Sequence, residues 1–151
     1  MVPKLRRGNE ELMKVLFLDI DGVVNKRENY NPAIKNNLYP IDSYCAFLVG
    51  RIELQTGCKV VLSSSWRHHP ESRQNVSQRV VELFDITPTL SGLRGDEVQA
   101  WLDEHPEVDK YAILDDDMDF YVYQAPNYFK TRFEDGLTDE IAQAVIEHLN
   151  S

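Results

Sequence analysis

The chain has 151 residues, of which 42% are hydrophobic and 27% charged, and its formal net charge is −9. This length and composition are typical of one soluble globular domain, and the negative charge argues against non-specific adhesion to nucleic acid or to anionic membranes. The sequence lacks an apolar run long enough for a membrane span, and its two cysteines, Cys45 and Cys58, form neither a disulfide framework nor a metal-ligand motif, which favours a reducing cytoplasmic location.

We expect residues 1–151 to form a single domain that begins with a polar arm over residues 1–12. A continuous apolar run follows at 15–20, which predicts a strand buried on both faces of a parallel sheet. Residues 26–41 are polar, rich in Asn and contain Pro32 and Pro40, so we predict a long irregular insertion there. An insertion of this length is too small for a large cap domain.

The rest of the chain alternates between helical and strand patterns. The spacing of apolar residues and the candidate cap residues predict helices at 42–56, at 71–84, from Asp96 to about Glu104, and from Thr138 onward. Further strands are predicted at 59–62, around Thr89 and Leu90, at 111–114, and at 128–132 as an edge strand. This alternation predicts a three-layer α/β fold with a mainly parallel sheet flanked by helices.

Polar and acidic side chains follow three of the predicted strands. Asp19 and Asp21 end the first strand, and two later strands are followed by serines and by an acidic stretch: Ser63, Ser64 and Ser65, then Asp115, Asp116, Asp117 and Asp119. Because open α/β sheets bind ligands at the carboxyl ends of their strands, we expect these groups to meet at one edge. Several carboxylates in one place repel each other unless a cation lies among them, and oxygen ligands favour Mg²⁺.

The same residue types are suited to chemistry on a phosphate ester. Bound Mg²⁺ attracts phosphate oxygens, and serine and arginine side chains can bind the remaining ones. A carboxylate that faces the phosphorus can act as a nucleophile and form an acyl phosphate. A second carboxylate two residues later can protonate the leaving alcohol and then deprotonate water.

Three stretches of the sequence resemble the motifs of a known superfamily. FLDIDGVV is similar to the first motif of the haloacid dehalogenase (HAD) superfamily of phosphohydrolases, an apolar strand followed by DxDG. VVLSSS resembles its second motif and YAILDDD its fourth, and their order and spacing match over nearly the whole chain. The SSSWR, LRGDEVQAWL and YFKT…GLT stretches resemble, more narrowly, the small HAD domains associated with RNA-repair proteins.

The resemblance implies a Rossmann-like (HAD-like) fold and a Mg²⁺-dependent hydrolase that forms an aspartyl-phosphate. It implies that Asp19 is the nucleophile and Asp21 the general acid and base. It further implies that Asp19, the main-chain carbonyl of Asp21, and Asp115 with Asp116 hold the metal ion, with Asp117 as an alternative to Asp116.

The resemblance also implies a phosphate-binding serine and a cation from the third motif. We assign the serine to Ser64, which lies two residues before Trp66 as the Thr does in similar T-x-W sequences, with Ser63 as the alternative. The third motif usually supplies a Lys, and no Lys lies at the expected place. Arg94, in the loop before a predicted helix, is the first candidate to replace it, and Arg67 is the second.

Two other classes of function remain open at this point. A receiver-like signalling module also combines acidic residues, a Ser or Thr and a cation, but it carries its acceptor Asp on a later strand. A non-catalytic phosphate-binding domain would agree with the missing Lys. The expected partner is a phosphorylated substrate, either a small molecule or a nucleic-acid end. The sequence does not indicate which of the two it is, and it does not indicate the oligomeric state.

Overall fold

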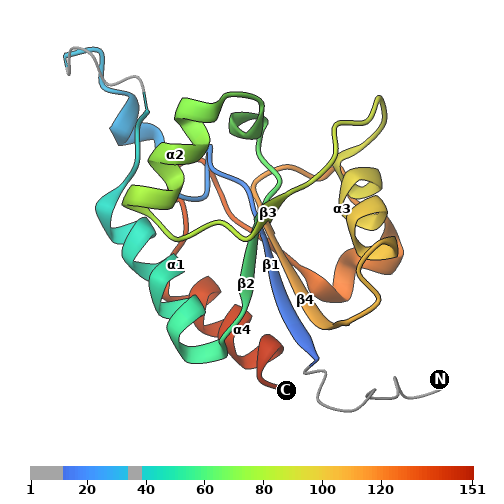
Figure 1. The fold of residues 1–151 in the computed structure, drawn as a ribbon. Helices are drawn as coiled ribbons and strands as arrows, with labels where there is room; N and C mark the ends of the chain where they lie inside the picture. Colours follow the sequence, from blue (N-terminus) through green and yellow to red (C-terminus); the bar gives the residue numbers. More distant parts are fainter. Residues whose placement is uncertain (1–11, 34–38) are drawn as a thin grey trace.

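A five-stranded parallel sheet forms the centre of the computed structural model, which describes residues 12–33 and 39–151. The strand order is β3-β2-β1-β4-β5, and each neighbouring pair is parallel (Figure 1). The strands are β1 (Met13–Leu18), β2 (Lys59–Leu62), β3 (Asp85–Ile86), β4 (Val108–Asp115) and β5 (Tyr128–Lys130). The α/β fold with a parallel sheet is therefore as predicted.

Helices cover both faces of the sheet. Residues of α1, α2 and α4 pack in the larger hydrophobic core with one face of the sheet, and residues of α3 pack in the smaller core with the other face (Figure 1). The helices are α1 (Ser43–Thr56), α2 (Pro70–Arg79), α3 (Arg94–Asp103) and α4 (Asp139–Leu149). None of the helices in the described ranges is long and apolar enough to cross a membrane.

The central strand β1 explains why its sequence is a continuous apolar run. Leu16 and Leu18 belong to the core beneath α1 and α4, whereas Val15 and Phe17 belong to the core beneath α3. All four side chains are fully buried, because successive residues of a strand point to opposite faces and both faces are covered.

Several predicted elements differ from the structure in their bounds. The strand predicted at 111–114 is β4, which is longer at both ends, and the strand predicted at 128–132 is β5, which ends at Lys130. Three other elements differ more. The helix predicted at 71–84 is α2, which ends at Arg79, because the β-branched Val80 and Val81 favour leaving the helix. The amide of Phe84 then donates to Val60 O, so the next strand, β3, forms at Asp85–Ile86 rather than around Thr89 and Leu90.

The third helix begins earlier than predicted. Its first residue is Arg94, and Asp96 lies inside the first turn, where its carboxylate accepts a hydrogen bond from the Leu93 amide at 3.0 Å. Asp96 therefore does stabilise the start of this helix, but from within it rather than from the cap position.

The predicted arm and insertion lie partly outside the described residues. Of the arm over residues 1–12, only Leu12 is described. The insertion over residues 26–41 contains a short 3₁₀ helix, Arg27–Tyr30, and its residues 34–38 lie outside the described ranges.

Candidate active site

Three strand ends meet at the centre of the sheet. The amide of Asp19 donates to Leu114 O at 3.0 Å, and the amide of Ser63 donates to Leu18 O at 2.9 Å, so the ends of β1, β2 and β4 lie side by side. After β1, the strands β2 and β3 are added on one side of it, and β4 and β5 are then added on the other side. Such a reversal of strand order is the place where open α/β sheets bind ligands.

Three carboxylates form the acidic centre of this site. Asp19, Asp115 and Asp116 each offer an oxygen within 4.8 Å of the others, with Asp19 and Asp115 buried and Asp116 half-buried. Two of them come from the end of β4 and one from the turn after β1. The structure thus brings together the three predicted metal-binding carboxylates.

The turn after β1 is held by Gly22 and Asn25. Gly22 has a φ of 81°, and a Cβ atom there would lie 2.2 Å from Asp116 Oδ2. Asn25 is fully buried; its Oδ1 accepts from the Gly22 amide, and its Nδ2 donates to Asp21 Oδ1 and Pro40 O. Glycine is therefore needed here both for its backbone conformation and for the close approach of the carboxylate.

Asp21 lies beside the acidic centre and accepts hydrogen bonds from three side chains. The Tyr30 hydroxyl donates to Asp21 Oδ1 at 2.6 Å, Asn25 Nδ2 donates to the same oxygen at 3.1 Å, and Trp66 Nε1 donates to Oδ2 at 3.2 Å. Burial and the hydrogen bond to Asp21 raise the pKa of Tyr30, so its hydroxyl remains a donor. These contacts fix the orientation of the Asp21 carboxylate.

The two candidate serines follow β2 and are both buried. Ser64 caps the 3₁₀ helix Ser65–His68, and its Oγ accepts from the Trp66 amide at 3.1 Å. Ser63 Oγ is buried and has no hydrogen-bond partner among the described residues. Each serine is at the strand end next to Asp19, and the geometry leaves both as candidates for contact with a phosphoryl group.

Of the two candidate arginines, Arg94 is the one in contact with the acidic centre. Its Nη1 donates to Asp19 Oδ1 at 3.1 Å and to Ser63 O at 2.6 Å, and its Nε lies 3.6 Å from Asp115 Oδ2. Arg94 is the first residue of α3, so this helix brings a cation to the carboxyl ends of β1 and β4.

Arg67 is directed elsewhere. Its guanidinium is buried, and Nη2 donates to Glu97 Oε2 at 2.7 Å while Nη1 donates to the carbonyls of Ser63 and Ser64. The ion pair with Glu97 joins the loop after β2 to α3. Arg67 therefore supports the backbone of the two serines and is not brought to the carboxylates.

The electrostatics of the acidic centre favour a cation. Burial raises the pKa of Asp19 well above its usual value, and the neighbouring Asp115 raises it further, while Arg94 acts in the opposite direction. Burial also raises the pKa of Asp115 to about 6 and that of Asp116 above its usual value. A positive ion beside them would restore their ionised forms.

The donor set fits a magnesium ion. Asp115 Oδ2 is buried and accepts no hydrogen bond from the described residues, so it has an unused lone pair at the centre of the site. All three side chains offer carboxylate oxygens, which Mg²⁺ prefers. The residues present thus suit a divalent cation.

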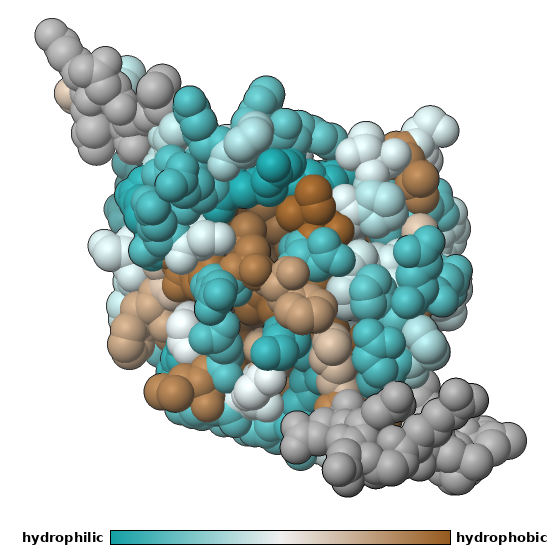
Figure 2. Space-filling model, viewed as in Figure 1, coloured by the Kyte–Doolittle hydropathy of each residue, from teal (hydrophilic) through white to brown (hydrophobic). Residues whose placement is uncertain are grey.

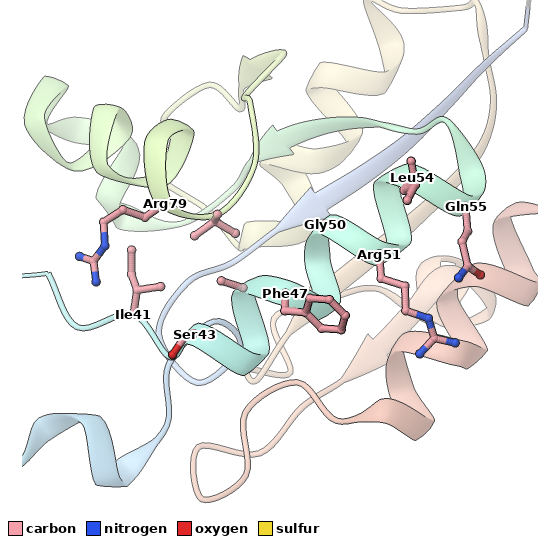
Figure 3. Close-up of a pocket in the computed structure, with 10 residues that line it drawn as sticks. Ile41, Ser43, Phe47, Gly50, Arg51, Leu54, Gln55 and Arg79 are labelled. Atoms are coloured by element: carbon pink, nitrogen blue, oxygen red, sulfur yellow. The ribbon is translucent and has the colours of Figure 1, made fainter.

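Two hollows lie near the α1–α2 side of the molecule. A cleft of about 440 Å³ is lined by Asp21 together with Tyr30, Tyr39 and Trp66. A second hollow, of about 710 Å³, runs between α1 and α2, where Phe47 and Leu54 project from α1 (Figure 3). The space-filling view shows hydrophobic surface in the middle of this face with hydrophilic residues around it (Figure 2). None of the candidate site residues lines the second hollow.

Several residues that hold this site are not among those predicted from the sequence. Asn25 follows the DxDG motif closely, and a buried amide that closes a turn after two aspartates is a signal that could have been used. Trp66 marks the position of Ser64 in the sequence, but its contact with Asp21 has no sequence signal. The contact between Glu97 and Arg67 joins distant segments and has no local signal.

The fold and the site define the class of the protein: a HAD-like domain, with aspartates after β1 and β4 of a parallel sheet. Residues 15–142 match the model of the family described as the HAD domain in Swiss Army Knife RNA repair proteins, and the chain belongs to this family. The resemblance inferred from the three motifs is thus confirmed. Searches of curated proteins and of solved structures found no match.

Proposed function

We propose that this chain is a Mg²⁺-dependent phosphatase that acts through an aspartyl-phosphate on Asp19. The observation that carries the proposal is the meeting of three strand ends, which brings a buried carboxylate, two further carboxylates, two serines and an arginine to one place. Membership of a HAD family supports a phosphohydrolase type of function.

The proposed reaction has two steps. A carboxylate oxygen of Asp19 attacks the phosphorus, the bond to the leaving oxygen breaks, and Asp21 gives its proton to that oxygen. Water then attacks the phosphorus of the aspartyl-phosphate, Asp21 takes the proton from the water, and the bond to Asp19 breaks to release phosphate. Proton transfer by a positioned side chain typically contributes about 10²–10⁴-fold in rate.

The metal ion would be held by Asp19, the main-chain carbonyl of Asp21, Asp115 and Asp116. When bound there, Mg²⁺ supplies positive charge to the phosphoryl oxygens during the transfer. Arg94 supplies the second positive charge in place of the usual lysine, and it also neutralises Asp19 before substrate binds. Ser64, with Ser63 as the alternative, donates a hydrogen bond to the phosphoryl group.

We propose a phosphomonoester as the substrate, with a nucleotide or a nucleic-acid end as the favoured class. The family description, which refers to RNA repair proteins, supports this class. The insertion after β1 is short, so a large substrate would have access to the site. The net charge of −9 argues against tight binding of a long polyanion, which favours recognition of an end.

The decisive experiment compares Asp19→Asn with the wild-type protein, using p-nitrophenyl phosphate and Mg²⁺. The proposal expects activity to fall to background, because an amide cannot form the acyl phosphate. Asp109→Asn is the matched control, because it removes the same single negative charge at an exposed position on β4. Full activity of Asp19→Asn would reject the mechanism.

The alternatives give different results in the same assays. A receiver-like module would form a stable phosphorylated protein after treatment with acetyl phosphate, without turnover. A non-catalytic domain would release no phosphate from a panel of metabolites, nucleotides and end-phosphorylated oligonucleotides. Release of phosphate that depends on both Mg²⁺ and Asp19 would exclude both alternatives.

A further inference from the structure

The cleft beside Asp21 has an aromatic wall. Tyr30, Tyr39 and Trp66 line it, and Ser65, His68 and Ser72 add polar groups. The rings of Tyr39 and Trp66 meet edge to face, with centroids 5.5 Å apart. Three aromatic side chains around a cleft of about 440 Å³ form a surface suited to a flat ring.

This wall is connected directly to the proposed general acid. The Tyr30 hydroxyl and the Trp66 Nε1 both donate to the Asp21 carboxylate, so two of the three rings are oriented by the group that would protonate the leaving oxygen. The leaving group must contact Asp21 during that step. The cleft opens beside Asp21, so it has space for the rest of a leaving group that contacts this carboxylate.

We propose that this cleft is the leaving-group subsite and that it takes the base of a nucleoside, with the ring against Tyr39 and Trp66. This inference rests on the proposed function, because it assigns the part of the substrate that departs. Aromatic side chains bind bases through their faces with little dependence on base identity. The hydroxyl and imidazole groups of Ser65 and His68 are suited to the ring nitrogens and the sugar hydroxyls.

A kinetic comparison tests the subsite through Tyr39→Leu, which removes the ring and keeps an apolar side chain. The measured quantity is the ratio of kcat/KM for a nucleoside monophosphate to kcat/KM for ribose 5-phosphate, both with Mg²⁺. We expect this ratio to fall roughly tenfold, mainly through KM, as for the loss of one stacked ring. Tyr39→Phe removes only the hydroxyl that contacts Glu71 and should keep the ratio.

A binding experiment without Mg²⁺ is independent of catalysis. Adenosine should quench the fluorescence of Trp66, ribose should not, and Tyr39→Leu should weaken the adenosine effect by a similar factor. The other tryptophan, Trp101, is buried against Phe17 and His105 and contributes a constant signal.

The results separate the subsite from the proposed function. Two results would overturn the proposed subsite. One is an unchanged ratio of the two kcat/KM values in Tyr39→Leu. The other is that adenosine neither quenches the fluorescence of Trp66 nor competes with the substrate. Binding of adenosine without phosphate release from any substrate would instead reject the phosphatase, and with it the leaving-group role of the cleft. Phosphate release together with the tenfold change in the ratio would support both.

Discussion

Gly22 occupies a position where a single methyl group would disturb both the turn and the acidic centre. Its backbone has a positive φ, and a Cβ atom would approach Asp116 Oδ2 to 2.2 Å. The neighbouring turn is fixed by Asn25, so the backbone has little freedom to move away. At the scale of single residues, the site therefore depends on a missing side chain as much as on its carboxylates.

Gly22→Ala should lower the free energy of unfolding by about 1–3 kcal/mol and weaken Mg²⁺ binding. The alanine would have a strained positive φ, and its Cβ would displace the Asp116 carboxylate. Chemical denaturation and calorimetry measure the two effects. Gly50→Ala is the matched control: a Cβ atom there meets nothing within 4 Å, and the position is inside α1. It should leave Mg²⁺ binding unchanged. Normal Mg²⁺ binding by Gly22→Ala would contradict the close approach.

Arg94→Met should move the rising limb of the pH–activity profile to higher pH. Arg94 lowers the pKa of Asp19. Without the Arg94 guanidinium, burial and Asp115 raise this pKa further, so Asp19 ionises at a higher pH. The profile of kcat/KM for p-nitrophenyl phosphate measures the shift. Arg94→Lys should keep more activity than Arg94→Met. Arg132→Met removes an arginine from an exposed ion pair and is the control, so it should leave the pH–activity profile unchanged. An unshifted profile in Arg94→Met would show that Arg94 does not lower the pKa of Asp19.

At the scale of elements, α3 is joined to the loop after β2 by a buried ion pair. Glu97 Oε2 accepts from Arg67 at 2.7 Å and from the Leu90 amide at 2.9 Å. Arg67 in turn donates to the carbonyls of Ser63 and Ser64. One pair of side chains thereby holds the helix that carries Arg94 against the serines.

Glu97→Leu should lower the free energy of unfolding by about 3–5 kcal/mol, because it leaves the Arg67 guanidinium buried without a counter-charge. Urea denaturation followed by circular dichroism measures the change. Asp135→Asn breaks an exposed pair with Arg132 and should cost less than about 1 kcal/mol. Equal costs for the two variants would show that the buried pair is no more important than a surface one.

The elements that the sequence predicted well are those whose pattern is local. β1 is apolar on both faces and lies within two residues of its predicted bounds. The helix predicted at 42–56 is α1, which ends at Thr56 as predicted. The position of β3 depends on a distant partner, the Val60 carbonyl, which no local pattern contains. Asp19 and Asp21 belong to a local motif, so the sequence alone was enough to identify them as candidates. Which of Arg94 and Arg67 contacts the carboxylates depends on how distant segments pack, so the fold was needed to show it.

At the scale of the whole molecule, the acidic centre links stability to pH and to metal ions. The pKa of Asp115 is about 6 in the folded chain against an ordinary value of 3.8. Between these values the folded chain binds more protons than the unfolded chain. In the absence of metal, this residue's contribution to stability is therefore complete below about pH 4 and is lost as the pH rises through 6.

Mg²⁺ should stabilise the protein more at pH 7.5 than at pH 5, because the ion requires ionised carboxylates. At 100 times its dissociation constant, a ligand specific to the folded state adds about 2.7 kcal/mol, or roughly 5–10 °C in Tm for a domain of this size. Thermal denaturation with Mg²⁺ and with EDTA at both pH values measures the difference. Asp115→Asn should remove most of the Mg²⁺ effect; an equal effect at both pH values would contradict the site.

The central position of β1 also determines when the site can assemble during synthesis. β1 pairs with β2 early in the chain, but its other edge pairs with β4, where Leu16 lies opposite Ala112. A ribosome must therefore translate past β4 before one edge of the first strand is covered and before Asp115 reaches Asp19. Until then the nascent chain has an open apolar strand edge, so its early folding depends on protection of that edge from other chains.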